Sequence, residues 1–213
     1  MNQLILSILL FAVSFLRNDV NSFEGSINIV EKNCYNTFYY TYKVKNQNVR
    51  IDEFNKENKL LKSLLIDTDK ETVFVLDSKN KAYANIKVKS VNNDLHNYMV
   101  IKSSNNRMVN GFKCYQWRVK NTKKNTEIAF WVTSNDLYFF EKLVKILNRT
   151  NENFMFFSRI SESYGFFPML TVERTLLRKE KNRIEVVKIK PENINNSVFI
   201  IPSDYKEVRI INS

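Results

Sequence analysis

The chain alternates apolar runs with polar turns in Leu64-Leu65-Ile66-Asp67-Thr68-Asp69-Lys70-Glu71-Thr72-Val73-Phe74-Val75-Leu76-Asp77-Ser78-Lys79-Asn80, residues 64–80. β-Branched and aromatic residues favour strands, whereas Asp, Asn and Ser stabilise turns through hydrogen bonds from their side chains to the backbone. Residues 81–88 continue the pattern, with an apolar side chain at every second position. Apolar runs joined by such short turns predict neighbouring antiparallel strands.

The same pattern extends outward in both directions. It recurs in residues 26–29, 38–44, 49–51, 99–101, 112–119, 127–133, 171–177 and 183–189, and residues 197–201 form a short apolar run that we expect to be buried. Turns return at intervals of roughly eight to twelve residues, which is typical of an antiparallel meander and not of strand–helix–strand units. We therefore predict one β-rich domain over residues 23–213, mainly β within the α+β class.

One segment changes to a helical period. Ser134-Asn135-Asp136 has the side chains of a helix N-cap, and apolar residues then recur at helical spacing. These residues are Leu137, Phe140, Leu143, Val144 and Leu147. The pattern predicts an amphipathic helix over residues 137–149 that packs its apolar side on the sheet.

The first residues have the pattern of a secretory signal peptide. Residues 4–16 form an apolar run that is too short to span a bilayer, and Ser22 is a small residue suited to cleavage. No Lys or Arg precedes the run, so an uncleaved anchor or a buried strand is the alternative. We predict a signal peptide over residues 1–22 and hence an exported protein, either periplasmic or secreted.

The net charge of +11 results from 33 Lys and Arg against 22 Asp and Glu. A basic exported protein is attracted to a membrane surface with anionic lipids, to anionic glycans and to acidic partners, although lysines also suit exposed strands. Because the charge is diffuse and no recognised binding motif occurs, we expect no nucleic-acid partner.

Two cysteines, Cys34 and Cys114, lie far apart in the sequence. In an oxidising compartment they form either one disulfide that closes a long loop or two separate thiols, and the sequence leaves both open. Together with the single His96 they are too few and too widely spaced for a metal site. We therefore expect no metal and no cofactor.

The sequence contains no motif of a known catalytic mechanism. His96 lies in a polar loop, and 3 glycines are too few for the usual phosphate-binding loops. Asp67 and Asp69 could form an acid–base pair, but they flank a turn whose backbone hydrogen bonds account for them. The expectation is a protein without enzymatic activity.

Two aromatic stretches are the most apolar segments after residue 22. They are Phe154-Met155-Phe156-Phe157 and Gly165-Phe166-Phe167-Pro168-Met169-Leu170. Such stretches either fill a core or line a cavity for a hydrophobic ligand. The candidate ligand-binding residues are Phe154, Phe156, Phe157, Phe166, Phe167 and Met169.

The order of these segments resembles a family of bacterial exported domains, the domain-of-unknown-function family 4412. The resemblance covers most of residues 23–213. It rests on Phe23-Glu24-Gly25-Ser26-Ile27, Asn48-Val49-Arg50-Ile51, residues 66–77, Ala82-Tyr83, Gly111-Phe112-Lys113-Cys114, residues 126–132, Phe167-Pro168-Met169 and residues 199–205.

This resemblance implies a fold similar to that of the periplasmic lipoprotein carriers: a curved antiparallel sheet, or unclosed barrel, partly covered by helices. In those carriers the concave face of the sheet holds acyl chains, and the resemblance assigns no catalytic residue. The expected function is binding of a hydrophobic ligand, a lipid or a lipidated protein, on the concave face. The alternative is an interaction or scaffold module that binds another envelope protein through a sheet edge or an aromatic patch.

Overall fold

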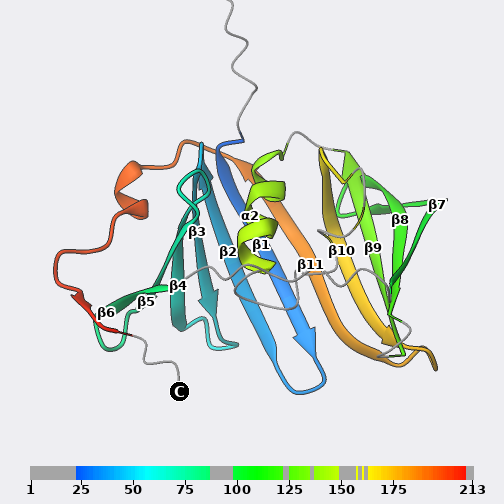
Figure 1. Cartoon of the computed structure of the whole chain (residues 1–213), viewed down its shortest axis with the longest axis horizontal. Coiled ribbons are helices and arrows are strands. Elements are labelled where there is room, and N and C mark those ends of the chain that lie inside the picture. Colours follow the sequence, from blue (N-terminus) through cyan, green and yellow to red (C-terminus); the bar gives the residue numbers. More distant parts are fainter. Residues whose placement is uncertain are drawn as a thin grey trace, which may run out of the picture.

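The computed structural model describes residues 23–86, 98–121, 125–134, 137–148, 157, 160 and 163–209. Strands within these residues form one sheet in the order β12-β6-β5-β4-β3-β2-β1-β11-β10-β9-β8-β7 (Figure 1). The elements are β1 (Gly25–Asn33), β2 (Thr37–Lys45), β3 (Asn48–Phe54), β4 (Leu60–Asp67), β5 (Thr72–Asp77), β6 (Ala82–Ile86), β7 (Tyr98–Val109), β8 (Phe112–Asn121), β9 (Thr126–Ser134), the helix α2 (Phe139–Asn148), β10 (Phe166–Thr175), β11 (Glu180–Pro191), the 3-10 helix η4 (Asn196–Phe199) and β12 (Lys206–Glu207). The predicted mainly β fold with a curved, unclosed antiparallel sheet is confirmed.

Two meanders join to make this sheet. Strands β1 to β6 follow one another as antiparallel neighbours, and so do β7 to β11. The antiparallel pairing of β1 with β11, in which Ile27 lies opposite Ile189, connects the two halves. At the far side of β6, the short strand β12 pairs in parallel with Ala82 and Tyr83. The sheet is therefore continuous and ends at β12 and at β7.

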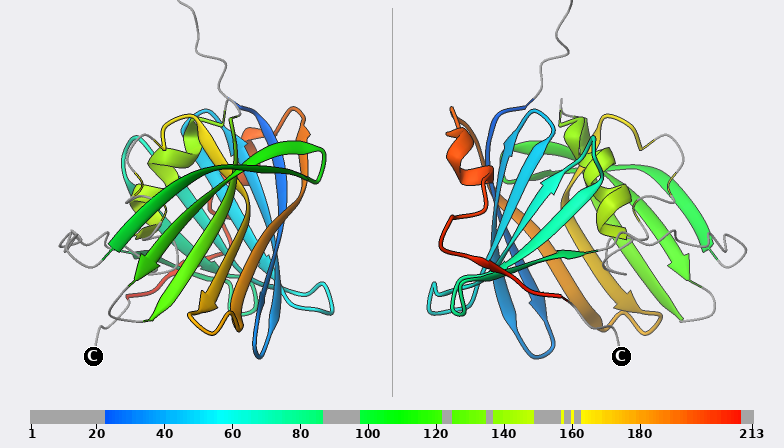
Figure 2. Two further views of the ribbon diagram at one scale, coloured as in Figure 1. Left: turned by 90° about the vertical axis from the view of Figure 1, so that its right-hand side faces the viewer. Right: turned by 60° about the vertical axis from the view of Figure 1, so that its left-hand side comes forward.

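The sheet bends around α2, as two further views show (Figure 2). Side chains from β2 and from β9, between which β1, β11 and β10 lie in the sheet order, contact the same space beneath this helix. The face toward α2 is therefore the concave one. Its buried core includes Phe140, Leu143, Val144 and Leu147 of α2. The helix predicted over residues 137–149 is confirmed with a slightly later start; Asn135 and Asp136 of its expected cap lie outside the described residues.

The turns form as their sequences predict. Asp67 accepts hydrogen bonds from the backbone N–H groups of Asp69 and Lys70, and Asp77 caps the next turn in the same way. Each turn ends in a residue with left-handed backbone, Glu71 at φ 50° and Lys81 at φ 48°. Asp67 and Asp69 are thus accounted for by turn geometry, as expected.

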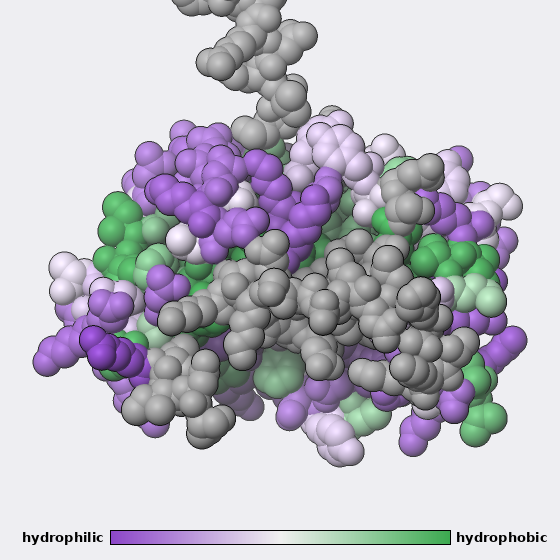
Figure 3. Space-filling model, viewed as in Figure 1, coloured by the Kyte–Doolittle hydropathy of each residue, from purple (hydrophilic) through white to green (hydrophobic). Residues whose placement is uncertain are grey.

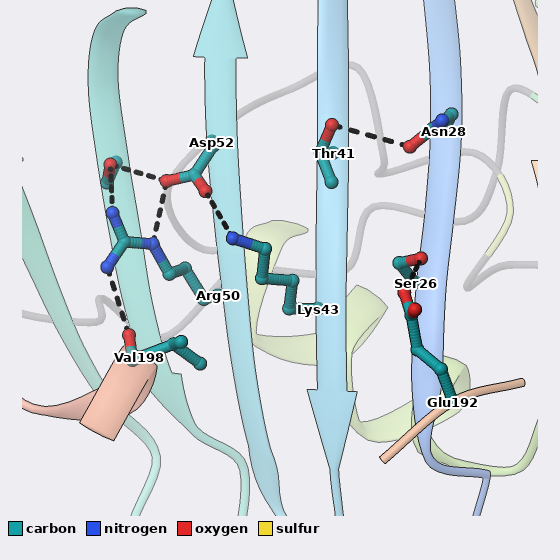
Figure 4. Close-up of polar contacts among 9 residues, drawn as sticks. Ser26, Asn28, Thr41, Lys43, Arg50, Asp52, Glu192 and Val198 are labelled. Carbon is teal, nitrogen blue, oxygen red and sulfur yellow. Dashed lines mark hydrogen bonds and ion pairs between the residues drawn. The ribbon is translucent and has the colours of Figure 1, made fainter. Parts of the chain in front are cut away.

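On the convex face, the C-terminal segment 192–209 is attached to the sheet by a buried ionic cluster (Figure 4). Asp52 accepts hydrogen bonds from Arg50 Nε at 2.7 Å and from the Ser63 hydroxyl at 2.6 Å, and Lys43 Nζ lies 3.6 Å from its second oxygen. Arg50 Nη1 in turn donates to the carbonyl of Val198 in η4 at 3.0 Å. The cluster therefore links β2, β3 and β4 to the segment that covers them.

The prediction that residues 197–201 form a buried run is wrong. Residues 196–199 form η4 and contain no buried side chain, and Ile200 is exposed. The physical reason is that β3, the strand beside η4, already has β2 and β4 as ladder partners. Residues 196–199 lie on the convex face instead of entering the sheet, and the Asn195 side chain starts η4 by accepting a hydrogen bond from the Ser197 N–H.

Of the two alternatives for the cysteines, the structure has two separate thiols and no disulfide between them. Cys34 is exposed in the β1–β2 turn, whereas Cys114 is buried in β8. Three strands, β11, β10 and β9, separate β1 from β8, which keeps the two sulfur atoms apart. Burial raises the pKa of the Cys114 thiol and shields it from reagents, whereas the Cys34 thiol is accessible.

The signal-peptide and histidine expectations fall on residues that the structure leaves undescribed. The proposed signal peptide, residues 1–22, and His96 both lie outside the described part. Within the described part, no helix is both long and apolar enough to cross a bilayer.

The C-terminal segment is predicted to detach in acid. Hydrogen bonds lower the pKa of three carboxyl groups that hold it: Glu24 through the Ile194 N–H, Glu192 through Lys190 and Asp204 through Lys81. A pKa that is lower in the folded state gives stability that is complete above the unfolded value and is lost as the pH falls below it. Limited proteolysis is expected to cleave this segment faster below about pH 4.5, the ordinary value for Glu, than at pH 7.

The matched control for this experiment is Glu24→Gln, which keeps the side-chain shape but not the charge. This variant should show a smaller difference between the two pH values, because one of the titrating groups is gone. Equal proteolysis of the wild type at both pH values would contradict the prediction.

Candidate ligand-binding face

A narrow apolar cavity of about 40 Å³ lies between α2 and the concave face of the sheet. Its walls come from five strands, from α2 and from Phe157. They comprise Ile29, Tyr42, Phe130, Phe140, Phe157, Phe167, Pro168, Thr171, Ile184 and Val186. A space of this size holds roughly one or two methyl-sized groups or waters. A longer apolar chain therefore requires α2 or Phe157 to shift.

Aromatic rings form one wall of this cavity. The ring of Phe157 packs edge-on against Phe130 at 5.3 Å and against Phe140 at 5.5 Å between centroids. Phe140 also packs edge-on against Phe167 at 4.7 Å. Edge-to-face rings at these separations attract one another beyond their simple burial. The wall is a packed aromatic cluster contributed by β9, β10, α2 and the segment after α2.

The structure brings together only part of the predicted set. Phe157 and Phe167 line the cavity. The ring of Phe166 packs instead on Trp117, with 4.7 Å between the ring centroids, and Met169 is buried elsewhere in the core. Phe154 and Phe156 lie outside the described residues. The aromatic stretches thus serve as core and as cavity wall at the same time.

Most of the cavity residues were missed from the sequence. Ile29, Tyr42, Ile184 and Val186 come from strands whose alternation places them on one face of the sheet. Alternation shows the face but not which strands are neighbours. Only the β1–β11 pairing, between strands more than 140 residues apart, brings Ile29 opposite Val186.

A polar rim borders the cavity on three adjacent strands. Two residues beyond Ile29 on β1 comes Glu31, which accepts hydrogen bonds from the Tyr40 hydroxyl at 3.1 Å and from Asn182 Nδ2 at 2.9 Å. Tyr40 lies two residues from Tyr42, and Asn182 lies two residues from Ile184. Side chains two residues apart lie on the same face of a strand. The concave face therefore changes from apolar to polar over two residues on each of these strands.

The rim presents mainly hydrogen-bond acceptors. Burial, followed by the charges of Glu31 and Glu53, raises the pKa of Tyr40, and the same causes in the same order raise that of Tyr42. Both hydroxyls are therefore protonated at neutral pH. The Asn182 Oδ1 atom is buried and has no hydrogen-bond partner among the described residues. A buried acceptor without a donor is unfavourable, so a donor group supplied at this rim is stabilising.

Among the described residues, no cluster of His, Cys, Asp or Glu has the grouping of a metal site. What the concave face offers is an aromatic and aliphatic wall, a small cavity and a rim of acceptors.

An open, curved antiparallel sheet with a helix on its concave face defines the class of fold. The chain belongs to the family described as domain of unknown function (DUF4412), whose model matches residues 23–205. The resemblance seen in the sequence is therefore confirmed. No curated protein matches the sequence.

Several solved structures have a similar fold. An uncharacterized conserved protein from Thermus thermophilus aligns with a TM-score of 0.54 at 9% identity, covering 90% of this chain and 93% of that one. MucB, in its complex with MucA from Pseudomonas aeruginosa, aligns with a TM-score of 0.50 at 8% identity, covering 84% of this chain and 56% of that one. A Vibrio parahaemolyticus domain described as an outer membrane lipoprotein-sorting protein aligns with a TM-score of 0.31 at 7% identity. The alignment covers 82% of this chain and 87% of that one. At these identities the first two likenesses concern the fold alone.

Proposed function

We propose that the protein binds an amphiphilic ligand, a lipid or a lipidated peptide, on the concave face. The observation that carries the proposal is that the apolar cavity on β1, β2 and β11 is bordered directly by hydrogen-bond acceptors on the same three strands. The apolar chain lies against Ile29, Ile184 and the aromatic wall. A hydroxyl or amide N–H of the ligand donates a hydrogen bond to the side-chain Oδ1 of Asn182 or to the carboxylate of Glu31.

The driving force is burial of apolar surface. It is worth about 25 cal/mol for each Å² removed from water, so a ligand chain of about 200 Å² contributes on the order of 5 kcal/mol. Because the cavity is small, part of this free energy is used to move α2 or Phe157 away from the sheet. The polar contacts of α2 tolerate such a movement, since its Lys142 pairs with Asp69 at the surface, where ion pairs contribute little.

Export is part of the proposal. Phe23 is the first residue after the predicted cleavage at Ser22, and its ring stacks on Phe139 at 5.9 Å between centroids. This contact supports a mature chain whose first residue is anchored to α2. Mass spectrometry of the protein purified from its host is expected to show a chain that starts at Phe23, and a chain that retains residues 1–22 would contradict the signal peptide.

Ligand binding is predicted to depend on Ile184. Ile184→Asp places a charge in the cavity wall and should weaken binding of a fluorescent fatty acid or acylated peptide by at least about tenfold, because the bound ligand would cover a carboxylate that has no partner. The matched control is Val187→Asp, on the same strand but exposed and outside the cavity wall. Titration of both variants against the wild type measures the effect.

The outcomes separate binding from mere stability. Both variants should give the wild-type circular dichroism spectrum, because Ile184 is only partly buried. Equal affinity of Ile184→Asp and wild type, or no affinity of the wild type for any acylated probe, would overturn the proposed function.

A second candidate is a protein-binding module that uses the free edge of the sheet. Strand β7 is the last in the sheet order, and its Met99 and Met108 are exposed. An edge strand offers unpaired backbone groups to an extended peptide. Purification of the protein with one stoichiometric protein and without lipid would favour this candidate.

A further inference from the structure

The β10–β11 hairpin ends in two exposed leucines. Leu176 is 58% and Leu177 is 94% exposed. The turn around them is well ordered by hydrogen bonds: the Arg178 N–H donates to the Thr175 carbonyl, and the Thr175 N–H donates to the Lys179 carbonyl. Arg178 has left-handed backbone at φ 62° and closes the turn. Both leucines are therefore held away from the core by a regular turn.

Other hairpins of this sheet have polar residues at the same place. The β4–β5 turn has the exposed Asp69 and Lys70, and the β5–β6 turn has the exposed Lys79 and Asn80; an Asp caps each turn. Polar residues are usual at hairpin tips, where side chains face water. A pair of leucines at such a tip is a departure that the stability of the turn does not require.

A third exposed side chain lies on the neighbouring hairpin, at the same end of the sheet. Tyr35, in the β1–β2 turn, is 89% exposed. The two turns are neighbours because Asn33 pairs with Asn182 at the ends of β1 and β11, and because the Cys34 thiol lies 3.8 Å from the Lys181 carbonyl. Figure 1 shows both hairpins at the same end of the sheet, and Figure 3 shows small, separate hydrophobic areas along that lower edge.

Exposed basic side chains lie around these tips, and the exposed Glu180 beside them pairs with Arg174 and Arg183. Lys32, Arg178 and Lys179 are exposed, and no carboxylate of the described residues lies within ion-pair distance of them. Lys181 pairs with Glu173 at 2.9 Å. The end of the sheet therefore combines protruding apolar residues with unpaired cations.

We infer that this end of the sheet, the hairpin tips with Tyr35, Leu176 and Leu177, docks on a bilayer containing anionic lipids. Aliphatic and aromatic side chains insert at the level of the head groups, while neighbouring Lys and Arg meet their negative charges. A protein partner is disfavoured, because stable protein interfaces bury about 800 Å² on each side and three side chains on separate tips form no such surface. The inference does not depend on what the concave face binds.

Vesicle cosedimentation tests the inference with the mature chain. The wild type should bind vesicles of equal phosphatidylglycerol and phosphatidylcholine, and binding should weaken at high salt. Leu176→Ser together with Leu177→Ser should lower the partition coefficient by about tenfold or more, because both leucines lose their insertion. The matched control is Met108→Ser, since Met108 is 64% exposed on β7 but lies outside these hairpin tips, and it should leave binding unchanged.

Charge reversal tests the electrostatic part. Arg178→Glu with Lys179→Glu should lower binding by roughly tenfold, whereas Lys70→Glu in the β4–β5 turn should have little effect. Binding that responds to charge reversal but not to the leucine pair would overturn insertion. Absence of vesicle binding by the wild type, or capture of a protein through Leu177 without vesicle binding, would overturn the membrane proposal itself.

Cys34 provides a second readout that a folding defect does not imitate. It is exposed in the β1–β2 tip, whereas Cys114 is buried, so a thiol-reactive, polarity-sensitive fluorophore labels the tip. The emission should shift to the blue on anionic vesicles. An unchanged emission while the protein is bound would show that another surface contacts the bilayer.

Discussion

Phe140→Ala is expected to lower the free energy of unfolding by about 3–5 kcal/mol, the range for a large aromatic side chain removed from a packed core. Phe140 is 5% exposed, and its ring contacts both Phe157 and Phe167. Its removal leaves a void in the aromatic wall that the sheet cannot close, because the strands beneath are fixed by their ladders. Urea denaturation followed by circular dichroism measures the change.

The neighbouring Phe139→Ala is the control for this variant. Phe139 is only partly buried and stacks on Phe23 at the surface, so its loss should cost less than half as much. Phe140→Ala also enlarges the cavity under α2. If the concave face holds an apolar chain, this variant should bind a longer acyl probe than the wild type does, despite its lower stability. Equal effects of the two substitutions on unfolding would show that α2 does not pack as described.

Asp52→Asn is expected to lower the free energy of unfolding by about 3 kcal/mol. Asp52 is 4% exposed and compensates Arg50 and Lys43, so the amide leaves two cations partly buried without a negative partner. Arg50 also donates to the Val198 carbonyl, which makes the attachment of the C-terminal segment depend on the same cluster. Proteolysis within residues 192–209 should therefore become faster than in the wild type.

Asp204→Asn is the control for the ionic cluster. Asp204 pairs with Lys81 at the surface of the same segment, at 2.6 Å, and exposed pairs contribute little to stability. This variant should lower the urea midpoint far less than Asp52→Asn does. If Asp52→Asn behaved like Asp204→Asn, the buried cluster would have no role in holding the segment.

The local structure of this protein was predictable from short patterns. Alternation in residues 38–44 predicted a strand, Asp67 and Asp77 predicted turns, and the spacing of Phe140, Leu143 and Val144 predicted α2. These features depend on contacts within a few residues of one another. The prediction of a buried run at residues 197–201 was wrong, because the same composition suits both a buried strand and a segment that packs on the convex face.

The candidate site was predicted only in part for a related reason. Phe157 and Phe167 are apolar enough to attract attention alone, whereas Ile29, Tyr42 and Ile184 look like ordinary strand residues. Nothing in residues 23–45 indicates that β1 has β11 as its second neighbour. Likewise, the sequence pattern predicts that Leu176 and Leu177 end a strand. In the structure they lie at the exposed tip of the β10–β11 hairpin.

The amino-acid sequence by itself determined the strands, the turns, the amphipathic helix and the basic charge, because side-chain period and turn chemistry act over a few neighbouring residues. The tertiary structure alone decided which strands became neighbours, where the cavity and its polar rim lie, and which apolar residues face water. Pairings between residues far apart in the chain depend on the free energy of the whole folded sheet, and no local pattern of side chains contains that information.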